Sequence, residues 1–263
     1  DISGGLDSRL IAALVKDSGA SHSYNVNYSS NSASKDVAIA NLIARKENKN
    51  LQVINYPNVK KNSTWEDLKV SFIAYDGLRS VLGKANVAHE IFTKKAENAD
   101  FLIGGHGGEL LREYWLAMPF RIPLKKFLTR HYTIPGISSL NQDLVSYHSS
   151  MASTILGEKT HLGGAELARI YYELRMRFWA GTRISVLNKY VSKFSPLNDS
   201  HQSEIAIAID PALKRYALAE KQVIEGLCST MFSYPSQYGF LKLSSSLGEK
   251  LARTREVVKE TIR

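Results

Sequence analysis

The chain opens with a glycine-rich turn that leads directly into a strongly helical segment. Asp-Ile-Ser-Gly-Gly-Leu-Asp-Ser is followed at once by the mostly apolar residues 9–15. Gly4 and Gly5 lack side chains, so backbone N–H groups can close on an oxyanion there. The first turn of the following helix presents its unpaired N–H groups and positive dipole end to the same anion. Ser3 and Ser8 can add hydroxyl donors. This string predicts a phosphate-binding loop.

Asp7 indicates what kind of phosphate the loop binds. A carboxylate beside a phosphate is repulsive unless a divalent cation lies between them, because hard cations take oxygens from both. The sequence therefore predicts a magnesium nucleotide. The phosphate loop of the nucleoside triphosphate hydrolases does not fit, because no lysine follows these glycines until Lys16. The alternative is an ordinary glycine turn capped by serine.

A second glycine-rich loop, Gly-Gly-His-Gly-Gly-Glu, begins at Gly104 after a short apolar run at 100–103. Earlier in the chain, predicted strands at 22–28 and 51–56 alternate with a predicted helix at 36–44, whose inward face is expected to include Val37, Ala40, Leu42 and Ile43. This alternation indicates an α/β fold, a Rossmann-like parallel sheet with helices on both faces. Ligands bind outside the carboxyl ends of parallel strands, so we expect both loops to converge on one site.

The later part of the chain has a different character. Residues 119–141 look like a loop, and the residues after them show mostly helical spacing, with a buried face formed by Leu167, Ile170, Tyr171, Leu174 and Phe178. Helices are also expected at 65–82, 88–99 and 249–263. We therefore expect an α/β nucleotide-binding core over 1–118 and a mostly helical continuation over 119–263, packed together as one domain.

Composition narrows the class of protein. A single cysteine, Cys228, excludes an internal disulfide framework and fits a reducing compartment; its apolar neighbours predict a buried thiol. No apolar run approaches the ~20 residues that span a bilayer, so we expect a soluble, cytoplasmic protein without membrane insertion. Since only Asp1 and Ile2 precede the first loop, where a strand is expected, we also expect residues upstream of this chain.

The net charge of +9 raises the possibility of nucleic-acid binding. The basic residues do not cluster, however, and occur as short pairs such as 60–61, 94–95 and 125–126. No nucleic-acid-binding module accompanies them. We interpret the excess as solvated surface and do not expect a nucleic-acid partner.

Taken together, the two loops resemble those of the asparagine synthetase family, in its synthetase domain, an N-type ATP pyrophosphatase. The resemblance is specific in Ser3-Gly-Gly-Leu-Asp-Ser8 and in the second loop. Supporting matches are the strand at 24–27, Asp36 with Ala40 and Ala44, and Ser195-Pro-Leu-Asn-Asp199. It implies an ATP-dependent amide-forming ligase, which adenylates a carboxylate, releases pyrophosphate and lets ammonia or an amine attack. The carboxylate would be a small molecule or linked to a polymer.

The resemblance also implies roles for individual residues. Asp7 and Glu109 would hold Mg²⁺, with Glu109 standing where the family usually has aspartate. The backbone near Val26 would receive the adenine of ATP. The remaining nucleotide contacts would come from the two loops, through Ser3, Gly4, Gly5, Asp7, Ser8, Gly104 and Gly105.

The chain departs from the family pattern at three places. His106 replaces a glutamate that handles protons; it is either a general base toward the amine or a residue that merely lines the loop. Gln237 stands at the position of an expected lysine, so Lys242 or Lys221 would have to supply that charge. Arg112 and the residues after it replace a Gly-Gly-Tyr string, which indicates a substrate other than aspartate.

Two alternatives to the ligase stay open. Gln237 and the altered second loop also fit a nucleotide-binding module of a larger synthetase that has lost turnover, and the positive charge fits a tRNA-modifying pyrophosphatase. The family's glutaminase domain is absent from this chain. The nitrogen would therefore come from free ammonia, from a glutaminase domain or subunit elsewhere, or from an amine on the acceptor.

Overall fold

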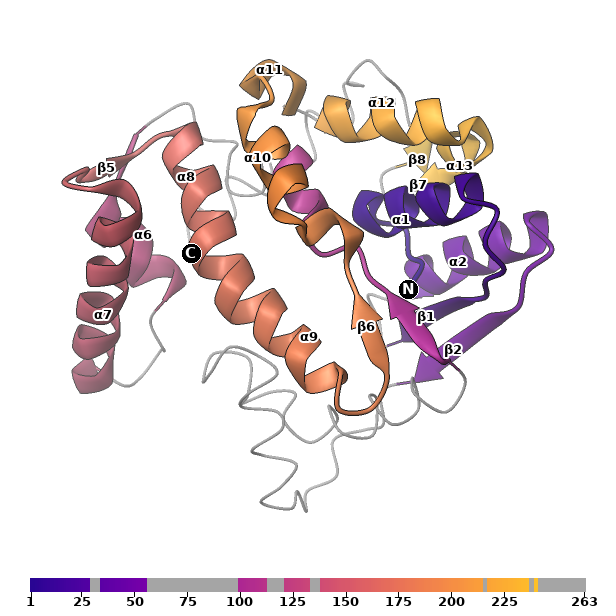
Figure 1. The fold of residues 1–263 in the computed structure, drawn as a ribbon, viewed down its shortest axis with the longest axis horizontal. Helices are drawn as coiled ribbons and strands as arrows, with labels where there is room; N and C mark the ends of the chain where they lie inside the picture. Colours follow the sequence, from indigo (N-terminus) through magenta and orange to yellow (C-terminus); the bar gives the residue numbers. More distant parts are fainter. Residues whose placement is uncertain are drawn as a thin grey trace.

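The structure, a computed structural model, describes residues 1–28, 34–55, 99–112, 121–132, 138–214, 217–236 and 239–240. Figure 1 shows small sheets surrounded by many helices, and the α/β class expected from the sequence is confirmed at this level. The N-terminal part runs in the order α1 (Leu6–Asp17), β1 (Tyr24–Tyr28), α2 (Ser34–Lys46) and β2 (Leu51–Asn55). These elements lie close to the strands and helices predicted there.

Two pairs of parallel strands carry the glycine loops. Strand β1 pairs with β2, and β3 (Phe101–Ile103) pairs with β6 (Ser192–Phe194), which comes much later in the chain. The first two residues link the pairs, because Ile2 N donates to Asn25 O of β1 at 2.8 Å and the amino terminus donates to Ile103 O of β3 at 3.2 Å. The loop that starts at Ser3 and the loop that starts at Gly104 therefore begin beside each other.

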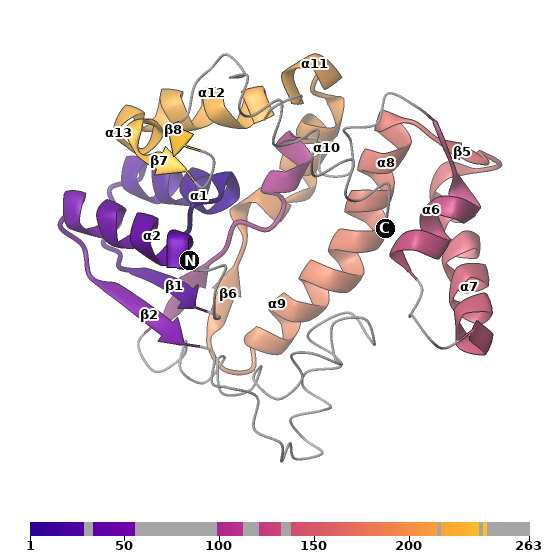
Figure 2. The ribbon, with the colours of Figure 1, turned by 180° about the vertical axis from the view of Figure 1, so that it is seen from behind.

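Helix α1 is the centre of the first hydrophobic core. Leu10 and Ala13 are at most 1% exposed and pack with β1, α2 and two C-terminal helices, α12 (Leu218–Leu227) and α13 (Ser229–Ser233). Figures 1 and 2 both show α12 lying over α1. Arg9 joins these elements: it is fully buried, and its guanidinium donates to the carbonyls of Tyr234 and Pro235 at 2.5 and 2.6 Å. The C-terminal helices are thus part of the core that supports the first loop.

A second core lies among helices far along the chain. It joins α6 (Leu124–His131), α7 (Ser138–Leu156) and α8 (Gly164–Ile170), and α8 continues through a π-helical segment, η3 (Tyr171–Gly181), into α9 (Thr182–Leu187). Within the expected buried face, Leu167, Ile170, Tyr171 and Leu174 are at most 3% exposed. The side chain of Phe178 is outside the described residues.

Three sequence expectations need correction. The loop expected at 119–141 contains helix α6 and the start of α7, because Phe127 and Leu128 bury an apolar face against the second core. Leu42, expected to face inward, is 36% exposed, since the buried face of α2 is formed by Ala40, Ile43 and Ala44. Cys228 is half-buried at the edge of the first core, with Sγ 3.1 Å from Thr230 Oγ1.

The remaining described elements are short. They are η2 (Gly108–Leu111), β4 (Ile122–Pro123), β5 (His161–Leu162), η4 (Pro196–Asn198), α10 (Ser200–Ala208), α11 (Pro211–Lys214), β7 (Pro235–Ser236) and β8 (Gly239–Phe240). The helices expected at 65–82 and 249–263 lie outside the described residues, as does the one at 88–99 except for Ala99, which is not helical. Among the described helices, none has the length and apolar character that crossing a membrane requires.

Candidate functional site

The first glycine loop is closed by its two serines. Ser3 N donates to Ser8 Oγ at 3.1 Å, Gly5 N donates to Ser3 Oγ at 3.1 Å, and the two hydroxyl oxygens lie 2.9 Å apart. Gly4 N donates to Asp36 Oδ1 at 2.8 Å, which fixes the loop to the first turn of α2. The loop thus places both hydroxyls at the beginning of α1. Gly5 is the N-cap of α1, and it has no side chain that could accept from the N–H groups of the first turn. Those groups can therefore donate to an anion, as an anion-binding helix end requires.

The second loop packs directly on Asp7 of the first. A Cβ added to Gly105 would lie 2.8 Å from the backbone C and O atoms of Asp7, and one added to Gly108 would lie 2.8 Å from Asp7 Oδ1. Only glycine permits so close an approach of one backbone to another chain segment. The structure therefore brings Asp7, Gly105 and Glu109 together, with Glu109 in η2, which starts at Gly108.

A third segment fixes the second loop from the other side. Ser195 Oγ lies 2.8 Å from Gly104 O and 2.6 Å from His106 O, in position to donate its one proton to either carbonyl. Gly107 has a φ of +101°, and a Cβ on it would come within 2.1 Å of Leu197 O. The string from Ser195 to Asp199, a supporting part of the family resemblance, is thus the support of this loop.

Arg112 and three carboxylates form the charged centre of the site. Arg112 Nε lies 3.1 Å from Asp7 Oδ1, its Nη2 lies 2.5 Å from Asp7 Oδ2, and its Nε lies 3.5 Å from Glu220 Oε2. Glu220, on α12, is fully buried, and within the described part of the chain neither of its carboxylate oxygens accepts a hydrogen bond. Burial alone would lower the pKa of Arg112, but the charges of Asp7, Glu220 and Glu109 raise it overall. The guanidinium stays charged and binds the carboxylates together.

The three carboxylates at the site, those of Asp7, Glu109 and Glu220, outnumber the one guanidinium beside them, that of Arg112. Glu109 is 8% exposed; burial and then the charge of Asp7 raise its pKa to about 7, against the opposing effect of Arg112. Burial also raises the pKa of Glu220, again with help from Asp7. Burying carboxylates this close together costs free energy unless protons or cations neutralise them. The site therefore favours a cation in addition to Arg112.

The residues around Asp7 are of the kind that binds magnesium, the metal that the resemblance implies. Carboxylate oxygens are the ligands that Mg²⁺ prefers, and the half-buried Asp7 and the buried Glu109 supply them beside the phosphate loop. Over the described residues no group of three or more histidine, cysteine, aspartate or glutamate side chains has the geometry to hold a metal ion by itself. Magnesium usually binds through one or two carboxylates together with substrate phosphates, so the residues fit an ion that arrives with a nucleotide.

The other predicted residues are placed as follows. His106 lies in the second loop with its carbonyl bonded to Ser195. Val26 is 2% exposed on β1, paired with Val53 of β2, so only its backbone is suited to an adenine contact. Lys221 is 1% exposed on α12. Gln237 and Lys242 lie outside the described residues.

Sequence reasoning missed the roles of three charged residues at the site. Lys193 of β6 has a side chain only 2% exposed, with Nζ 3.6 Å from Asp1 Oδ2, and a Cβ on Gly104 would lie 2.8 Å from Nζ. The sequence marks Arg112 only as a departure from the family string, and it does not mark Glu220. Lys193 and Glu220 come from elements that reach the loops only through tertiary packing, so local sequence carried no signal for them. Lys193 thus provides a buried positive charge at the second loop, in addition to Lys221 or Lys242, which the sequence predicts as substitutes for the lysine missing at Gln237.

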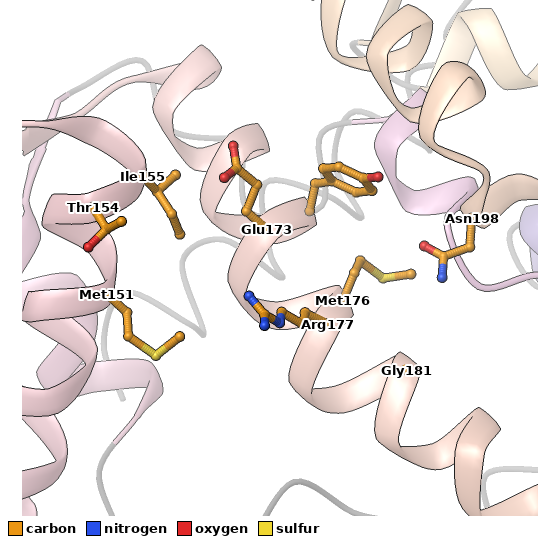
Figure 3. Close-up of a pocket in the computed structure, with 9 residues that line it drawn as sticks. Met151, Thr154, Ile155, Glu173, Met176, Arg177, Gly181 and Asn198 are labelled. Atoms are coloured by element: carbon orange, nitrogen blue, oxygen red, sulfur yellow. The ribbon is translucent and has the colours of Figure 1, made fainter.

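A cavity of about 580 Å³ lies beside the site, between α7, η3 and η4. Its apolar lining includes Met151 and Ile155 of α7 and Met176 of η3, and its polar lining includes Glu173, Arg177 and Asn198. Figure 3 shows the η3 helix passing between the α7 side chains on one side and Asn198 on the other.

Comparison with known proteins gives this chain no family. No protein-family model matches it, and no curated protein matches it either. Function must therefore be argued from the site.

Proposed function

We propose that the chain is an ATP-dependent amide-forming ligase of the asparagine synthetase type, with a Rossmann-like nucleotide-binding core. The proposal rests on one observation: the second glycine loop packs on Asp7 of the first, at 2.8 Å from a Cβ placed on Gly105 or Gly108. If both loops were ordinary structural turns, there would be no reason for them to pack against each other. Their contact is what a site that grips a metal-bound phosphate requires.

The residues divide the work of such a site between them. Ser3, Ser8 and the start of α1 would bind the pyrophosphate part of ATP through hydroxyl and backbone donors. Asp7 and Glu109 would hold Mg²⁺, which when bound neutralises phosphate charge. Lys193 and Arg112 add fixed positive charge at the two ends of the second loop. With the metal bound, a buried site of this kind would stabilise the charge that develops as pyrophosphate leaves an acyl-adenylate.

His106 would handle the proton in this proposal. Its carbonyl is held by Ser195, and Ser195 also holds Gly104, so the loop on which the imidazole sits is fixed at both sides. An imidazole titrates near neutral pH, as a general base toward an attacking ammonia or amine should. The nitrogen donor would be ammonia, delivered freely or from a separate glutaminase, or an amine of the acceptor.

One observation favours a second candidate, a nucleotide-binding module without turnover. Arg112 engages both oxygens of Asp7, the carboxylate that would have to face magnesium. If the nucleotide cannot displace this ion pair, the protein would bind ATP without cleaving it. The two candidates differ in one measurable product, pyrophosphate.

The decisive experiment measures pyrophosphate release from Mg-ATP with pooled carboxylates and ammonia. Wild type is compared with Asp7→Asn and with Asp17→Asn, a matched control at the exposed end of the same helix. We expect carboxylate-dependent release that Asp7→Asn abolishes and Asp17→Asn preserves. Binding of ATP without release would support the second candidate, and absence of both would overturn the proposed function.

A further inference from the structure

Glu220 is the carboxylate at the site whose hydrogen bonding is least complete. It lies in the first turn of α12, is fully buried, and accepts no hydrogen bond at either oxygen within the described part of the chain. Its Oε2 lies 3.5 Å from Arg112 Nε, which is longer than an ordinary hydrogen bond. A carboxylate buried in this way costs free energy, and in a folded protein such a group calls for an explanation.

Asp7 and Glu220 compete for the same guanidinium. Arg112 donates to both oxygens of Asp7, through Nε to Oδ1 and through Nη2 to Oδ2. The distances from Nε to Asp7 Oδ1 and to Glu220 Oε2, 3.1 and 3.5 Å, are similar. A small movement of the Arg112 side chain, which is 26% exposed, therefore exchanges one partner for the other.

The guanidinium needs a second acceptor if Asp7 is to bind a metal ion. A metal ion on Asp7 would stand beside the positive charge of Arg112, and the two cations repel each other. Glu109 is not the alternative acceptor, because it is the other proposed metal ligand and its Oε2 already accepts from Gly107 N at 3.1 Å. Among the three carboxylates of the site, Glu220 is left.

The start of α12 holds Glu220 in a fixed place. Ala217, the N-cap of α12, is fully buried and has a φ of +55°, a left-handed conformation that residues with a side chain rarely adopt. Such residues persist only where the surrounding structure fixes them, and they occur often at functional sites. Helix α12 also packs on α1 and η2, which carry Asp7 and Glu109.

We propose that Glu220 is a positioning residue that receives the guanidinium of Arg112 when a metal-bound nucleotide occupies the loops, and thereby frees Asp7 for the metal. Without nucleotide, Arg112 stays on Asp7 and holds the two loops together. With nucleotide, Arg112 pairs with Glu220, and both carboxylates keep a cation beside them. The inference rests on the proposed function for the nucleotide, and it explains how the ion pair on Asp7 can be displaced.

ATP binding with and without the metal tests this exchange. Isothermal titration calorimetry of the full chain, without carboxylate substrates, compares ATP with excess Mg²⁺ and ATP with EDTA. The variants are Glu220→Gln, which keeps the size of the side chain but removes its charge, and the control Glu225→Gln, half-exposed on the same helix. A hydrogen bond between charged groups changes affinity by roughly tenfold to a hundredfold.

We expect Mg²⁺ to tighten ATP binding in wild type and in Glu225→Gln. Glu220→Gln should lose roughly tenfold or more of this gain, because Arg112 then stays on Asp7, and should bind ATP in EDTA as wild type does. A merely structural role of Glu220 would weaken binding equally in both conditions. That result, or an unchanged effect of Mg²⁺, would overturn the inference.

The Nε–H resonance of Arg112 reports the exchange in wild type, even where a variant is too unstable to titrate. In isotope-labelled protein the signal is assigned by its absence in Arg112→Lys. It should move when Mg-ATP is added and stay in place with ATP and EDTA, and Glu220→Gln should suppress the movement. A signal that bound Mg-ATP leaves unmoved, or that moves equally in Glu220→Gln, would refute the exchange.

A parallel measurement of pyrophosphate release, with pooled carboxylates and ammonia, separates this inference from the proposed function. Release by wild type, with the same Mg-ATP affinity in wild type and Glu220→Gln, would leave the ligase standing and refute the exchange. A magnesium-dependent effect of Glu220→Gln without any pyrophosphate release would support the exchange and refute the ligase. Absence of ATP binding would overturn both.

Discussion

The guanidinium of Arg112 binds both carboxylate oxygens of Asp7, with Nε 3.1 Å from Oδ1 and Nη2 2.5 Å from Oδ2. Paired N–H donors that match a carboxylate are the strongest kind of ion-pair hydrogen bond in proteins. The pair joins the first turn of α1 to a residue 105 positions later, directly after the second loop. Beside any catalytic role, it therefore holds the two loops together.

Replacing Arg112 with Met should destabilise the protein strongly. The change leaves Asp7 and the fully buried Glu220 without their cation, and breaking a buried ion pair from one side costs about 3–5 kcal/mol. Arg112→Lys keeps the charge but loses the paired geometry, so its effect should be intermediate. Urea unfolding measures both. Lys159→Met, which removes the exposed pair with Glu166, is the control and should change stability by less than ~1 kcal/mol.

The buried carboxyl of Glu109 should make stability depend on pH. Its pKa is about 7 in the folded protein, where burial first and Asp7 second disfavour the charged form, against an ordinary value of 4.5. The unfolded chain loses this proton at lower pH than the folded chain. The protonated carboxyl of Glu109 therefore contributes its full stabilisation of the folded state below the unfolded pKa of 4.5, and this contribution is lost as the pH rises through the folded pKa of about 7.

At ~1.4 kcal/mol per pH unit, the loss due to Glu109 is on the order of 3 kcal/mol. Urea unfolding without magnesium, between pH ~5 and ~8, should show a decline in stability that Glu109→Gln reduces. Glu158→Gln, at an exposed position, should leave the decline unchanged. The same slope in Glu109→Gln and wild type would mean that Glu109 is not the group responsible.

The parts of the site that could be predicted from the sequence are those encoded locally. Gly4, Gly5 and Ser8 are contiguous with the helix they start, so the loop and the beginning of α1 follow from chemistry that neighbouring residues share. The same holds for β3 and the loop after it. The meeting of the two loops also followed from a general rule, because parallel strands place their carboxyl ends together.

The rest depends on contacts that sequence spacing does not encode. Glu220 reaches Arg112 because α12 packs over α1, and Lys193 reaches Gly104 because β6 pairs with β3. Nothing beside either residue in the sequence marks it as buried. Helix α6 was missed for a related reason: its buried face consists of little more than Phe127 and Leu128, which are stabilised by α7 and α8.

Glycine at position 107 should be irreplaceable for the geometry of the second loop. Gly107→Ala forces a side chain into a left-handed backbone, with its Cβ 2.1 Å from Leu197 O. Gly157→Ala is the matched control, since it has a φ of +67° and open space around it. The control should cost about 1 kcal/mol for the backbone alone, and Gly107→Ala about 1–3 kcal/mol more for the clash. Chemical denaturation measures the difference, and equal costs would mean that the segment at Leu197 yields easily.

Arg9 should be essential for attaching the C-terminal helices to the loop-bearing core. It is fully buried, its pKa is lowered by burial to about 10, and its Nη atoms donate to the carbonyls of Tyr234 and Pro235. Arg9→Met removes two charge-assisted hydrogen bonds, each contributing about 1.5–3 kcal/mol, and leaves two part-buried carbonyls without these donors. We expect a loss of roughly 3–5 kcal/mol in the free energy of unfolding.

The matched control for Arg9 is Arg169→Met, which removes only an exposed pair with Glu173 and should cost less than ~0.5 kcal/mol. Hydrogen exchange adds a local test. Because α12 and α13 pack on α1, losing Arg9 should expose amides of α13 and of the chain at Tyr234 before those of α7 in the separate second core. Uniform loss of protection throughout the molecule would instead show that the two cores unfold as one unit.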